Sequence, residues 1–226
     1  IDITSELFIN NHSKWDKKKR LDIFLSKCFP DGIYDLEFSN ILFRKWIIGA
    51  AKRIINPGIS HDGCLTLKGG PGLGKTQFFR KLMPEPFENR TGEINCDIRS
   101  SQKFVESIIG KSIACFDELA GLNESVIEEF KRLLSQQHID VRLAWRRDPQ
   151  RYLLRQGFCA TTNKDKFILD AALKRRLWVI ELNGKTRLDF DYLNENKKEL
   201  WSEAVYYAFK DKESHFLSLE EQRVLE

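Results

Sequence analysis

The stretch Gly69-Gly70-Pro71-Gly72-Leu73-Gly74-Lys75-Thr76 meets every fixed position of the phosphate-binding pattern G-x-x-x-x-G-K-[ST]. Glycines let the backbone turn with its N–H groups pointing inward, and the N-terminus of a following helix adds positive potential for a polyphosphate. In such a loop Lys75 reaches the β- and γ-phosphates of ATP, and the Thr76 hydroxyl holds Mg²⁺. The alternative is a glycine-rich turn that binds nothing.

The residues on either side of this loop have the character that a phosphate loop requires. The short apolar run Cys64–Leu67 before it is typical of a buried parallel strand. Gln77–Leu82 after it is typical of a helix, which Pro84 and Pro86 would end. We therefore expect a strand, a phosphate loop and a helix in succession, with Gln77 among the nucleotide-binding residues.

Composition places the chain among soluble globular proteins. Its 226 residues suit one sizeable domain with a small helical appendage, and no run of residues reaches the apolar length of a membrane span. The five cysteines are scattered and without C-x-x-C spacing, which predicts buried thiols in a reducing, cytoplasmic setting. No signal peptide is apparent. The chain begins with Ile1 rather than Met, so we expect a piece of a longer protein.

The order of the predicted elements indicates an α/β fold in three regions. Helical patterns at 21–28 and 41–55 place a small helical region at 1–60. Strands and helices then alternate over 61–186, which is typical of a central parallel sheet flanked by helices. The expected elements there are a weak strand at 93–97, a helix capped by Ser101, a strand at 112–116, a helix capped by Asn123, and strands at 157–162 and 177–182. An amphipathic helix at 192–209 dominates the last region, 187–226.

A second motif fits the phosphate loop. The apolar run Ile113-Ala114-Cys115-Phe116 ends in Asp117-Glu118, about forty residues after the loop, where an ATPase of this kind carries its acidic pair. Asp117 would hold the hydrated Mg²⁺, and Glu118 would orient and deprotonate the attacking water. Paired acids favour hydrolysis by water over the phosphate transfer of a small-molecule kinase. Taken alone, the pair would be an ordinary solvated start of a loop.

Two further sets of polar residues complete a possible catalytic site. Asn163 ends the strand Phe158–Thr162, where an amide would reach the γ-phosphate or the water, although asparagine is also a routine turn former. Arg175 and Arg176 precede the strand at 177–180 and are candidates for a guanidinium that stabilises transition-state charge in a neighbouring subunit. Their alternative role is a basic helix end that complements the helix dipole.

The segment from Arg142 to Arg155 is a candidate surface for nucleic acid. It has five arginines against one aspartate, together with Trp145 and Tyr152, and Asp148-Pro149 predicts a turn between two strand-like pieces. Arginines with interleaved aromatic residues can grip phosphates and stack bases without sequence preference. The arginines nearest the turn, Arg146, Arg147 and Arg151, are the best candidates. The alternatives are a solvated hairpin and one that pairs with acids of an adjacent subunit. The basic run at 17–20 is a weaker candidate for the same role, and its alternative is a solvated helix start.

The chain resembles the virulence-associated protein E family, an AAA+ group of phages and pathogenicity islands related to superfamily 3 helicases. The similarity runs nearly end to end and is carried by combinations such as Pro57-Gly58 before the first strand, Thr161-Thr162-Asn163, and Arg175-Arg176-Leu177-Trp178. The family usually shows Gly-Asn before its two arginines, where this chain has Leu173-Lys174. The resemblance implies an AAA+ P-loop core, a ring that is often a hexamer, Asn163 as sensor, and either Arg175 or Arg176 as the arginine that acts in trans.

Three functional hypotheses follow. The first is an ATP-hydrolysing motor, a helicase that acts as a ring on single-stranded or forked DNA during replication of a phage or mobile genetic element. The second is a replication initiator or helicase loader that uses ATP without processive unwinding. The third is a P-loop phosphotransferase that binds no nucleic acid and works as a monomer. A primase or origin-binding domain elsewhere in a parent chain is compatible with the first two, and none of the three involves a membrane.

Overall fold

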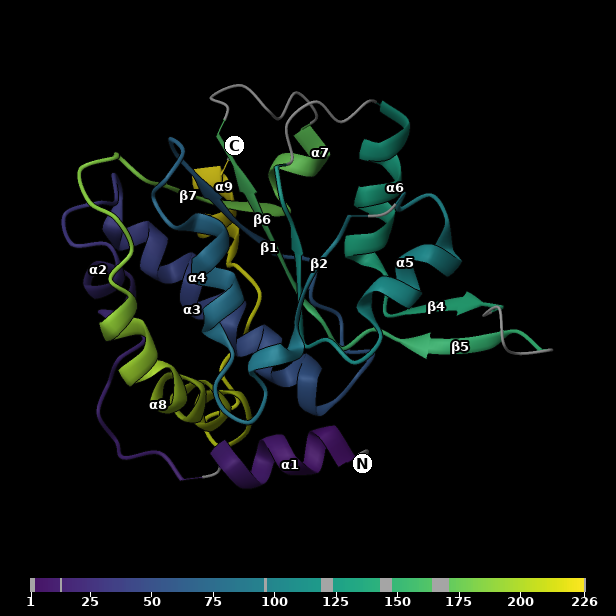
Figure 1. Cartoon of the computed structure of the whole chain (residues 1–226), viewed down its shortest axis with the longest axis horizontal. Coiled ribbons are helices and arrows are strands. Elements are labelled where there is room, and N and C mark those ends of the chain that lie inside the picture. The colour runs from purple at the N-terminus through teal and green to yellow at the C-terminus, as the bar shows by residue number, and fades with distance from the viewer. Residues whose placement is uncertain are drawn as a thin grey trace.

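A five-stranded, fully parallel sheet organises the chain (Figure 1). The computed structural model describes residues 3–12, 14–95, 97–118, 124–142, 148–163 and 171–225. Its strands are β1 (Cys64–Lys68), β2 (Thr91–Glu93), β3 (Ile113–Phe116), β6 (Gly157–Thr162) and β7 (Leu177–Glu181), in the spatial order β2-β3-β6-β1-β7. Because every neighbouring pair is parallel, the carboxyl ends of the strands meet at one edge of the sheet, where α/β proteins bind ligands.

The three central strands are buried on both faces, which explains their continuous apolar runs. Alternate residues belong to two separate clusters of the core. Leu65 and Leu67 of β1 pack in one cluster, and Cys64 packs in the other. The α/β fold with a parallel sheet flanked by helices, which the sequence predicts, is thus confirmed.

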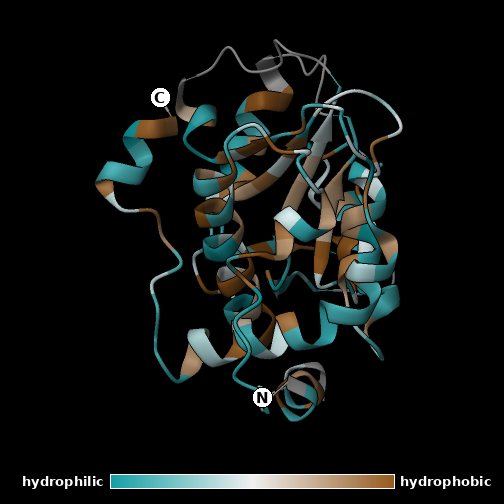
Figure 2. Cartoon of the chain, turned by 90° about the vertical axis from the view of Figure 1, so that its left-hand side faces the viewer, coloured by the Kyte–Doolittle hydropathy of each residue, from teal (hydrophilic) through white to brown (hydrophobic). Residues whose placement is uncertain are grey.

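Helices cover both faces of the sheet. One face is covered by α2 (Phe24–Cys28), α3 (Leu36–Ile55), α4 (Lys75–Leu82) and α8 (Phe190–Phe209), with α1 (Ile3–His12) packed on α3 and α8. The other face carries α5 (Ser101–Ile108), α6 (Glu124–Ser135) and α7 (Ala171–Lys174). Figure 2 shows apolar residues concentrated on the strands and the inward sides of these helices. The short 3₁₀ helix η1 (Glu88–Arg90) and helix α9 (Leu219–Leu225) complete the helices of the described residues.

Several boundaries differ from those that the sequence predicts. The weak strand is β2, at Thr91–Glu93 rather than 93–97, because these residues pair with Ile113–Cys115 of β3. Ser100, not Ser101, caps α5, since its side chain accepts a hydrogen bond from Lys103 N (3.4 Å). Helix α3 begins five residues earlier than expected, at Leu36 instead of 41, after Asp35 accepts from Phe38 N (3.0 Å). The expected cap of α6, Asn123, lies outside the described residues.

The N-terminal region also departs from expectation. Helix α1 was not predicted, and α2 begins at Phe24 instead of at residue 21. The basic run at 17–20 is not a helix start but part of an irregular segment. Its last residue, Arg20, donates to both carboxylate oxygens of Asp16 (2.8 Å each). Glu203 of α8 accepts from the backbone N–H of Arg20 (2.6 Å) and of Leu21 (3.0 Å), so this segment is anchored to the C-terminal helix.

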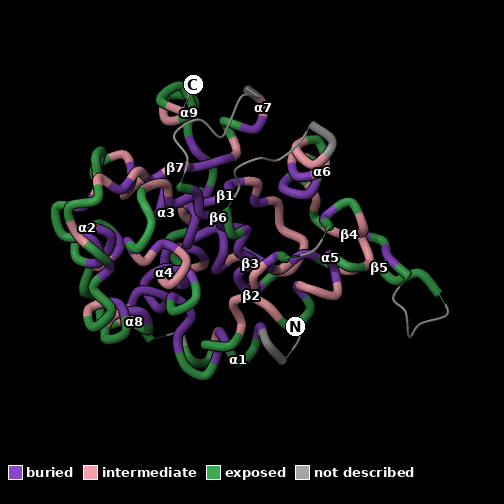
Figure 3. Tube along the Cα trace, turned by 45° about the horizontal axis from the view of Figure 1, so that its top comes forward, coloured by how far each residue is buried: buried purple, intermediate pink, exposed green. Residues whose placement is uncertain are grey.

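A two-stranded antiparallel hairpin projects from the side of the domain (Figure 3). Its strands are β4 (His138–Val141) and β5 (Gln150–Leu153). The predicted hairpin is therefore present, but its first strand precedes Arg142, because the register pairs Val141 with Gln150 and His138 with Leu153.

Arg53, a fully buried residue of α3, fixes the base of this hairpin. Its guanidinium donates only to carbonyl oxygens: Gln136 (2.6 Å), His61 (3.0 Å), Leu154 (3.3 Å) and Gln156 (3.5 Å). Burial lowers the pKa of Arg53 to about 10, a value at which the side chain stays charged at neutral pH. The residues that flank β4 and β5 are thus held to the helical layer by one cation.

No helix within the described ranges has both the length and the apolar character needed to cross a bilayer.

Replacing Arg53 by methionine should lower the free energy of unfolding by about 3 kcal/mol, because four carbonyl groups lose a charged donor and several stay buried without a partner. Urea unfolding followed by circular dichroism measures the change. Arg99→Met is the matched control, since Arg99 is exposed and pairs only with Asp97 two residues away, and it should leave the midpoint unchanged. Equal midpoints for the two variants would contradict the role given to Arg53.

Candidate nucleotide-binding site

The phosphate loop joins β1 to α4 with backbone angles that require glycine. Gly72 (φ 77°) and Gly74 (φ 90°) both lie in the left-handed region, and Gly74 immediately precedes the first residue of α4. A Cβ on Gly74 would also lie 2.6 Å from the Cβ of Leu188, which packs against the loop. The loop therefore has its shape both from its own glycines and from a segment more than a hundred residues further along the chain.

Lys75 is the centre of the site's hydrogen bonds. Its ammonium donates to the carbonyl oxygens of Gly69 (2.8 Å) and Gly70 (2.7 Å) and to Oδ1 of Asn163 (2.6 Å). The residue is only 7% exposed. Burial lowers the pKa of Lys75, while the carboxylates of Glu118 and Asp117 act in the opposite direction. Asn163 at the end of β6 is thus brought to the loop, where a phosphate would compete for the same ammonium.

Asp117 and Glu118 follow β3 and are held by hydroxyl groups. Oδ1 of Asp117 accepts from Thr76 (3.0 Å) and from Thr161 (2.6 Å). Glu118 has a left-handed backbone (φ 56°), and its carboxylate accepts from the hydroxyl of Thr162 (3.3 Å). Non-glycine residues in this region of φ/ψ space are concentrated at functional sites.

These residues line one cleft of about 570 Å³ at the carboxyl edge of the sheet. Its walls include the loop from Pro71 to Gln77, both acids, Thr161 and Asn163. The volume lies within the range of small-molecule sites. Of the residues that the sequence singles out for this site, Pro71 to Gln77, Asp117, Glu118 and Asn163 therefore come together around one cleft.

Four lining residues were not predicted as part of the site: Thr161, Arg187, Leu188 and Phe190. Arg187 and Phe190 are exposed, and Arg187 makes no hydrogen bond or ion pair with another described residue. The hydroxyl of Thr161 was recognisable as part of Thr161-Thr162-Asn163 at a strand end. No local signal marks Arg187 or Phe190, because only the docking of α8 beside the loop brings them there: Leu188 N donates to Leu73 O (3.1 Å).

The oxygen atoms around Thr76 suit Mg²⁺ bound together with a phosphate. The hydroxyl of Thr76 and the carboxylate of Asp117 lie 3.0 Å apart, and hydroxyl and carboxylate oxygens are the ligands that this ion prefers. Among the residues that the structure describes, no group of three or more His, Cys, Asp or Glu side chains is placed to hold a metal. A magnesium ion here would accordingly need phosphate oxygens and water as further ligands, which is its usual environment.

Arg175 and Arg176 lie at the opposite edge of the sheet. Arg176 O accepts from Cys64 N (2.8 Å) at the start of β1, whereas the phosphate loop follows the end of β1. With a rise of about 3.3 Å per residue, the two edges are roughly 15–20 Å apart. Arg176 also donates to Ser135 Oγ (3.2 Å) and Ala172 O (2.7 Å), while Arg175 is exposed beside Asp62 and Trp178. Neither arginine can reach the cleft of the same chain.

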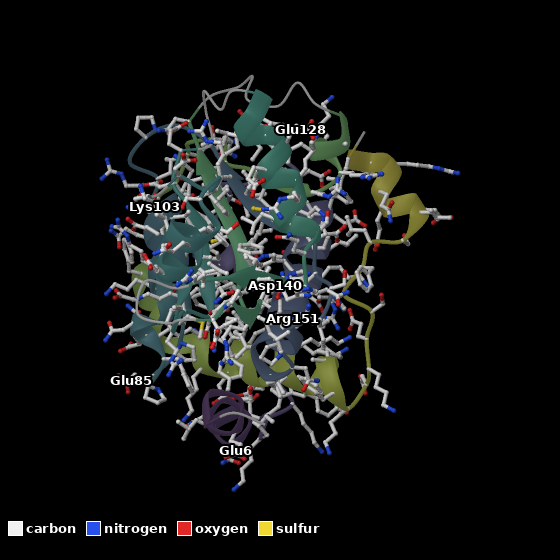
Figure 4. The ribbon with its side chains drawn as sticks, turned by 90° about the vertical axis from the view of Figure 1, so that its right-hand side faces the viewer. Glu6, Glu85, Lys103, Glu128, Asp140 and Arg151 are labelled. Atoms are coloured by element: carbon white, nitrogen blue, oxygen red, sulfur yellow. The ribbon has the colours of Figure 1, made fainter. Side chains whose placement is uncertain are left out.

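The predicted nucleic-acid residues are only partly described. Arg146 and Arg147 lie outside the described residues. Arg151 is exposed on β5, and its guanidinium donates to both carboxylate oxygens of Asp140 on β4 (3.0 and 3.4 Å; Figure 4). This partner lowers the positive charge that the sequence assigned to the hairpin. An ion pair so exposed contributes little to stability, so a phosphate can replace the aspartate.

A phosphate-loop motif after β1, an acidic end of β3 and a polar end of β6 between them give this α/β domain the arrangement of a P-loop fold. Residues 9–226 match the model of the virulence-associated protein E-like domain, and the chain belongs to this family.

Solved structures share the fold. The apo structure of the NrS-1 C-terminal region (305-718) aligns with a TM-score of 0.63 at 14% identity, covering 96% of this chain and 53% of that one. Its A form aligns with the same TM-score and coverage at 15% identity. The chain thus spans about half the length of these structures. The X-ray structure of JCV helicase aligns with a TM-score of only 0.42 at 14% identity, over 99% of this chain and 66% of that one. The comparison with curated proteins found no match.

Thr161→Val should reduce nucleotide hydrolysis about tenfold and raise the Mg²⁺ concentration needed for half-maximal rate, because Asp117 loses the hydroxyl that orients it. A steady-state ATPase assay with a magnesium titration measures both quantities.

Thr66→Val is the matched control for this substitution. Thr66 is equally buried in the neighbouring strand β1, and its hydroxyl bonds only to Cys64 O (3.2 Å), away from the cleft. The control should keep the wild-type magnesium dependence. A variant at Thr161 that hydrolyses ATP like the control would contradict a positioning role for this hydroxyl.

Proposed function

We propose that the chain is an ATP-hydrolysing DNA motor, a helicase of the AAA+ class related to superfamily 3, that works as a homo-oligomeric ring in replication of a phage or mobile genetic element. The observation that carries the proposal is the single cleft in which Lys75, Thr76, Asp117, Glu118 and Asn163 meet. Membership of the virulence-associated protein E-like family supports it. A cytoplasmic location follows from this role.

Each side chain in the cleft has a chemical task in ATP hydrolysis. The loop N–H groups and Lys75 bind the β- and γ-phosphates. The phosphate oxygens then replace the three acceptors that Lys75 has in this structure, Gly69 O, Gly70 O and Asn163 Oδ1. Thr76 and Asp117 would hold Mg²⁺, and the ion would supply positive charge beside the phosphates. Glu118 accepts the proton of the attacking water, and Asn163 orients that water or contacts the γ-phosphate. Arg187 and Phe190 border the same cleft and extend the contact surface for the nucleotide.

The opposite placement of Arg175 supports a shared site between subunits. The guanidinium of Arg176 is engaged within its own subunit, whereas Arg175 is exposed and has no hydrogen bond to another described residue. Arg175 is therefore the better candidate for the trans-acting arginine. In enzymes that use a trans-acting arginine, this residue raises the rate of nucleotide hydrolysis roughly 10³–10⁵-fold.

The hairpin β4–β5 is the proposed contact with single-stranded DNA in the ring. It projects from the domain, and Arg151 and Arg142 are exposed on and beside it. Salt-sensitive binding without sequence preference is the expected behaviour of such a surface. A forked-duplex assay distinguishes a motor from an initiator or loader, since only a motor releases the strand in an ATP-dependent way.

Lys75→Ala should abolish ATP hydrolysis, because the ammonium that binds the phosphates is lost. The measurement is the hydrolysis rate with and without single-stranded DNA at low salt, over a range of protein concentrations. Lys68→Ala, at the end of strand β1 before the loop and paired with Glu181 (3.0 Å), is the control and should retain activity. Wild-type turnover in the Lys75 variant would overturn the nucleotide site, and turnover indifferent to DNA and concentration would overturn the ring motor.

Mixing two inactive variants tests the shared site. Arg175→Ala should bind ATP normally and hydrolyse it at least 100-fold more slowly. When it is mixed with an equal amount of Lys75→Ala protein, about a quarter of the interfaces in a ring combine an intact loop with an intact arginine, and activity should return to that extent. No recovery in mixed rings of confirmed size would contradict a trans-acting Arg175.

A further inference from the structure

A second cleft, of about 700 Å³, lies far from the nucleotide site. It is formed where α1, the segment after it, the end of α3 and the end of α8 meet. Phe190, the first residue of α8, borders the nucleotide cleft, and Phe209, the last, borders this second cleft. The two are therefore separated by nearly the whole helix, about 28 Å at 1.5 Å per residue. We call it the aromatic–lysine cleft; its lining residues are Ile9, Lys14, Trp15, Lys17, Ile55, Val205, Tyr206, Phe209 and Lys210.

Aromatic rings form one part of its wall. The Trp15 ring lies 4.9 Å from that of Tyr206, centroid to centroid, and Phe209 follows one helical turn later on α8. Tyr206 is 36% exposed, and Trp15 and Phe209 are half-buried. Rings that border a cleft and keep part of their faces open are platforms on which a planar base can stack.

The charged groups of the lining are all positive. Lys14, Lys17 and Lys210 are exposed, and none has a side-chain hydrogen bond or ion pair to a residue that the structure describes. No carboxylate is among the lining residues. Lys18 and Lys19, the next two residues of the chain, are also exposed. The cleft thus combines apolar ring surface with cations, which suits a ligand that is both aromatic and anionic.

The segment after α1, which carries Lys14, Trp15 and Lys17 of the cleft, is held in place by hydrogen bonds. Trp15 Nε1 donates to Lys18 O (3.0 Å), and Lys18 N donates to Asp16 Oδ1 (3.0 Å). The Asp16–Arg20 pair braces the segment internally, and the two backbone bonds to Glu203 tie it to α8. The carboxylate of Asp16 is satisfied by these bonds and does not neutralise the lysines of the cleft. The rings and ammonium groups are therefore presented on a preorganised surface, which reduces the entropic penalty of binding.

We propose that the aromatic–lysine cleft binds single-stranded DNA, with a base stacked against Tyr206 and Trp15 and the adjoining phosphates held by Lys14, Lys17 and Lys210. An acidic protein segment would satisfy the lysines but would leave the rings without a planar partner, so the lining favours nucleic acid. The site is separate from the β4–β5 hairpin, and DNA binding there does not require ATP hydrolysis. This proposal can therefore be tested independently of the proposed ATPase.

Charge reversal tests the phosphate contacts. The variant Lys14→Glu/Lys17→Glu/Lys210→Glu is compared with wild type by fluorescence anisotropy of a labelled dT oligonucleotide across a salt series. Affinity should fall at least tenfold, and the slope of log K against log salt should flatten by about 2, at about 0.7 per lost contact. The control Lys81→Glu/Lys103→Glu/Lys198→Glu makes the same change of charge at exposed lysines elsewhere and should have a smaller effect. Equal loss in both variants, or no loss in the first, overturns the proposal.

An abasic oligonucleotide tests the stacking. Wild-type protein should bind dT at least about tenfold more tightly than an abasic strand of the same length, and Tyr206→Leu should remove most of this difference. Tyr34→Leu, at a tyrosine that is 68% exposed and outside the cleft, is the control for this substitution. Two outcomes would assign the cleft to an acidic protein instead. In one, the wild type binds both strands equally. In the other, polyglutamate displaces DNA from the wild type but not from the lysine variant, and that variant keeps the preference for dT.

ATP hydrolysis without DNA is measured on the same variants. The cleft residues lie outside the catalytic cleft, so basal turnover should be unchanged while DNA binding falls. Loss of DNA binding with intact basal turnover supports the cleft. Absence of turnover in wild type would instead count against the proposed ATPase and would leave the DNA measurements valid.

Discussion

The position of β6 between β1 and β3 is the constraint on which the candidate site depends. Three strands that are far apart in the sequence end side by side, and each end carries polar groups: the phosphate loop after β1, Asp117-Glu118 after β3, and Thr161 to Asn163 at the end of β6. The end of β6 therefore touches both neighbours. Asn163 accepts from Lys75 on one side, and the hydroxyls of Thr161 and Thr162 donate to the acids on the other. A different strand order would separate these groups by the roughly 4.8 Å spacing of each intervening strand.

Helix α8 extends this constraint to the rest of the molecule. The segment before α8 is hydrogen-bonded at both sides. Leu188 N donates to Leu73 O of the phosphate loop (3.1 Å), and Asp189 N donates to Cys28 O of α2 (2.8 Å). Its middle packs on α3, and Trp201 donates to Leu82 O (2.9 Å) at the end of α4. Glu203 anchors the segment that follows α1, which carries Trp15 and the lysines. One rigid helix thus positions a wall of the nucleotide cleft at its first turn and a wall of the aromatic–lysine cleft at its last.

Local pattern was sufficient to predict the parts of the site that short segments encode. A strand, a glycine loop and a helix are contiguous in the chain, and an apolar strand followed by acids is equally local. Both were therefore predicted, together with Asn163 beside them. Arg187 and Phe190 were not predicted, because their place in the site is set by tertiary packing over a hundred residues of intervening chain. The first strand of the hairpin was misplaced for a related reason: its register depends on cross-strand pairing and on the carbonyl groups that Arg53 holds. A buried arginine without a carboxylate partner leaves no signature in the sequence.

The geometry of the sheet also constrains how the proposed ring must be assembled. The nucleotide cleft opens at the carboxyl edge of the sheet, and Arg175 lies at the amino edge, near the starts of β1 and β7. For the arginine of one subunit to reach the nucleotide of the next, the amino edge of one sheet must face the carboxyl edge of its neighbour. That contact is heterologous, and a two-fold symmetric dimer with a single interface of that kind cannot satisfy it for both subunits. A heterologous contact that closes makes a ring, so the placement of two residues at opposite ends of parallel strands connects the chemistry of one cleft to the symmetry of the assembly.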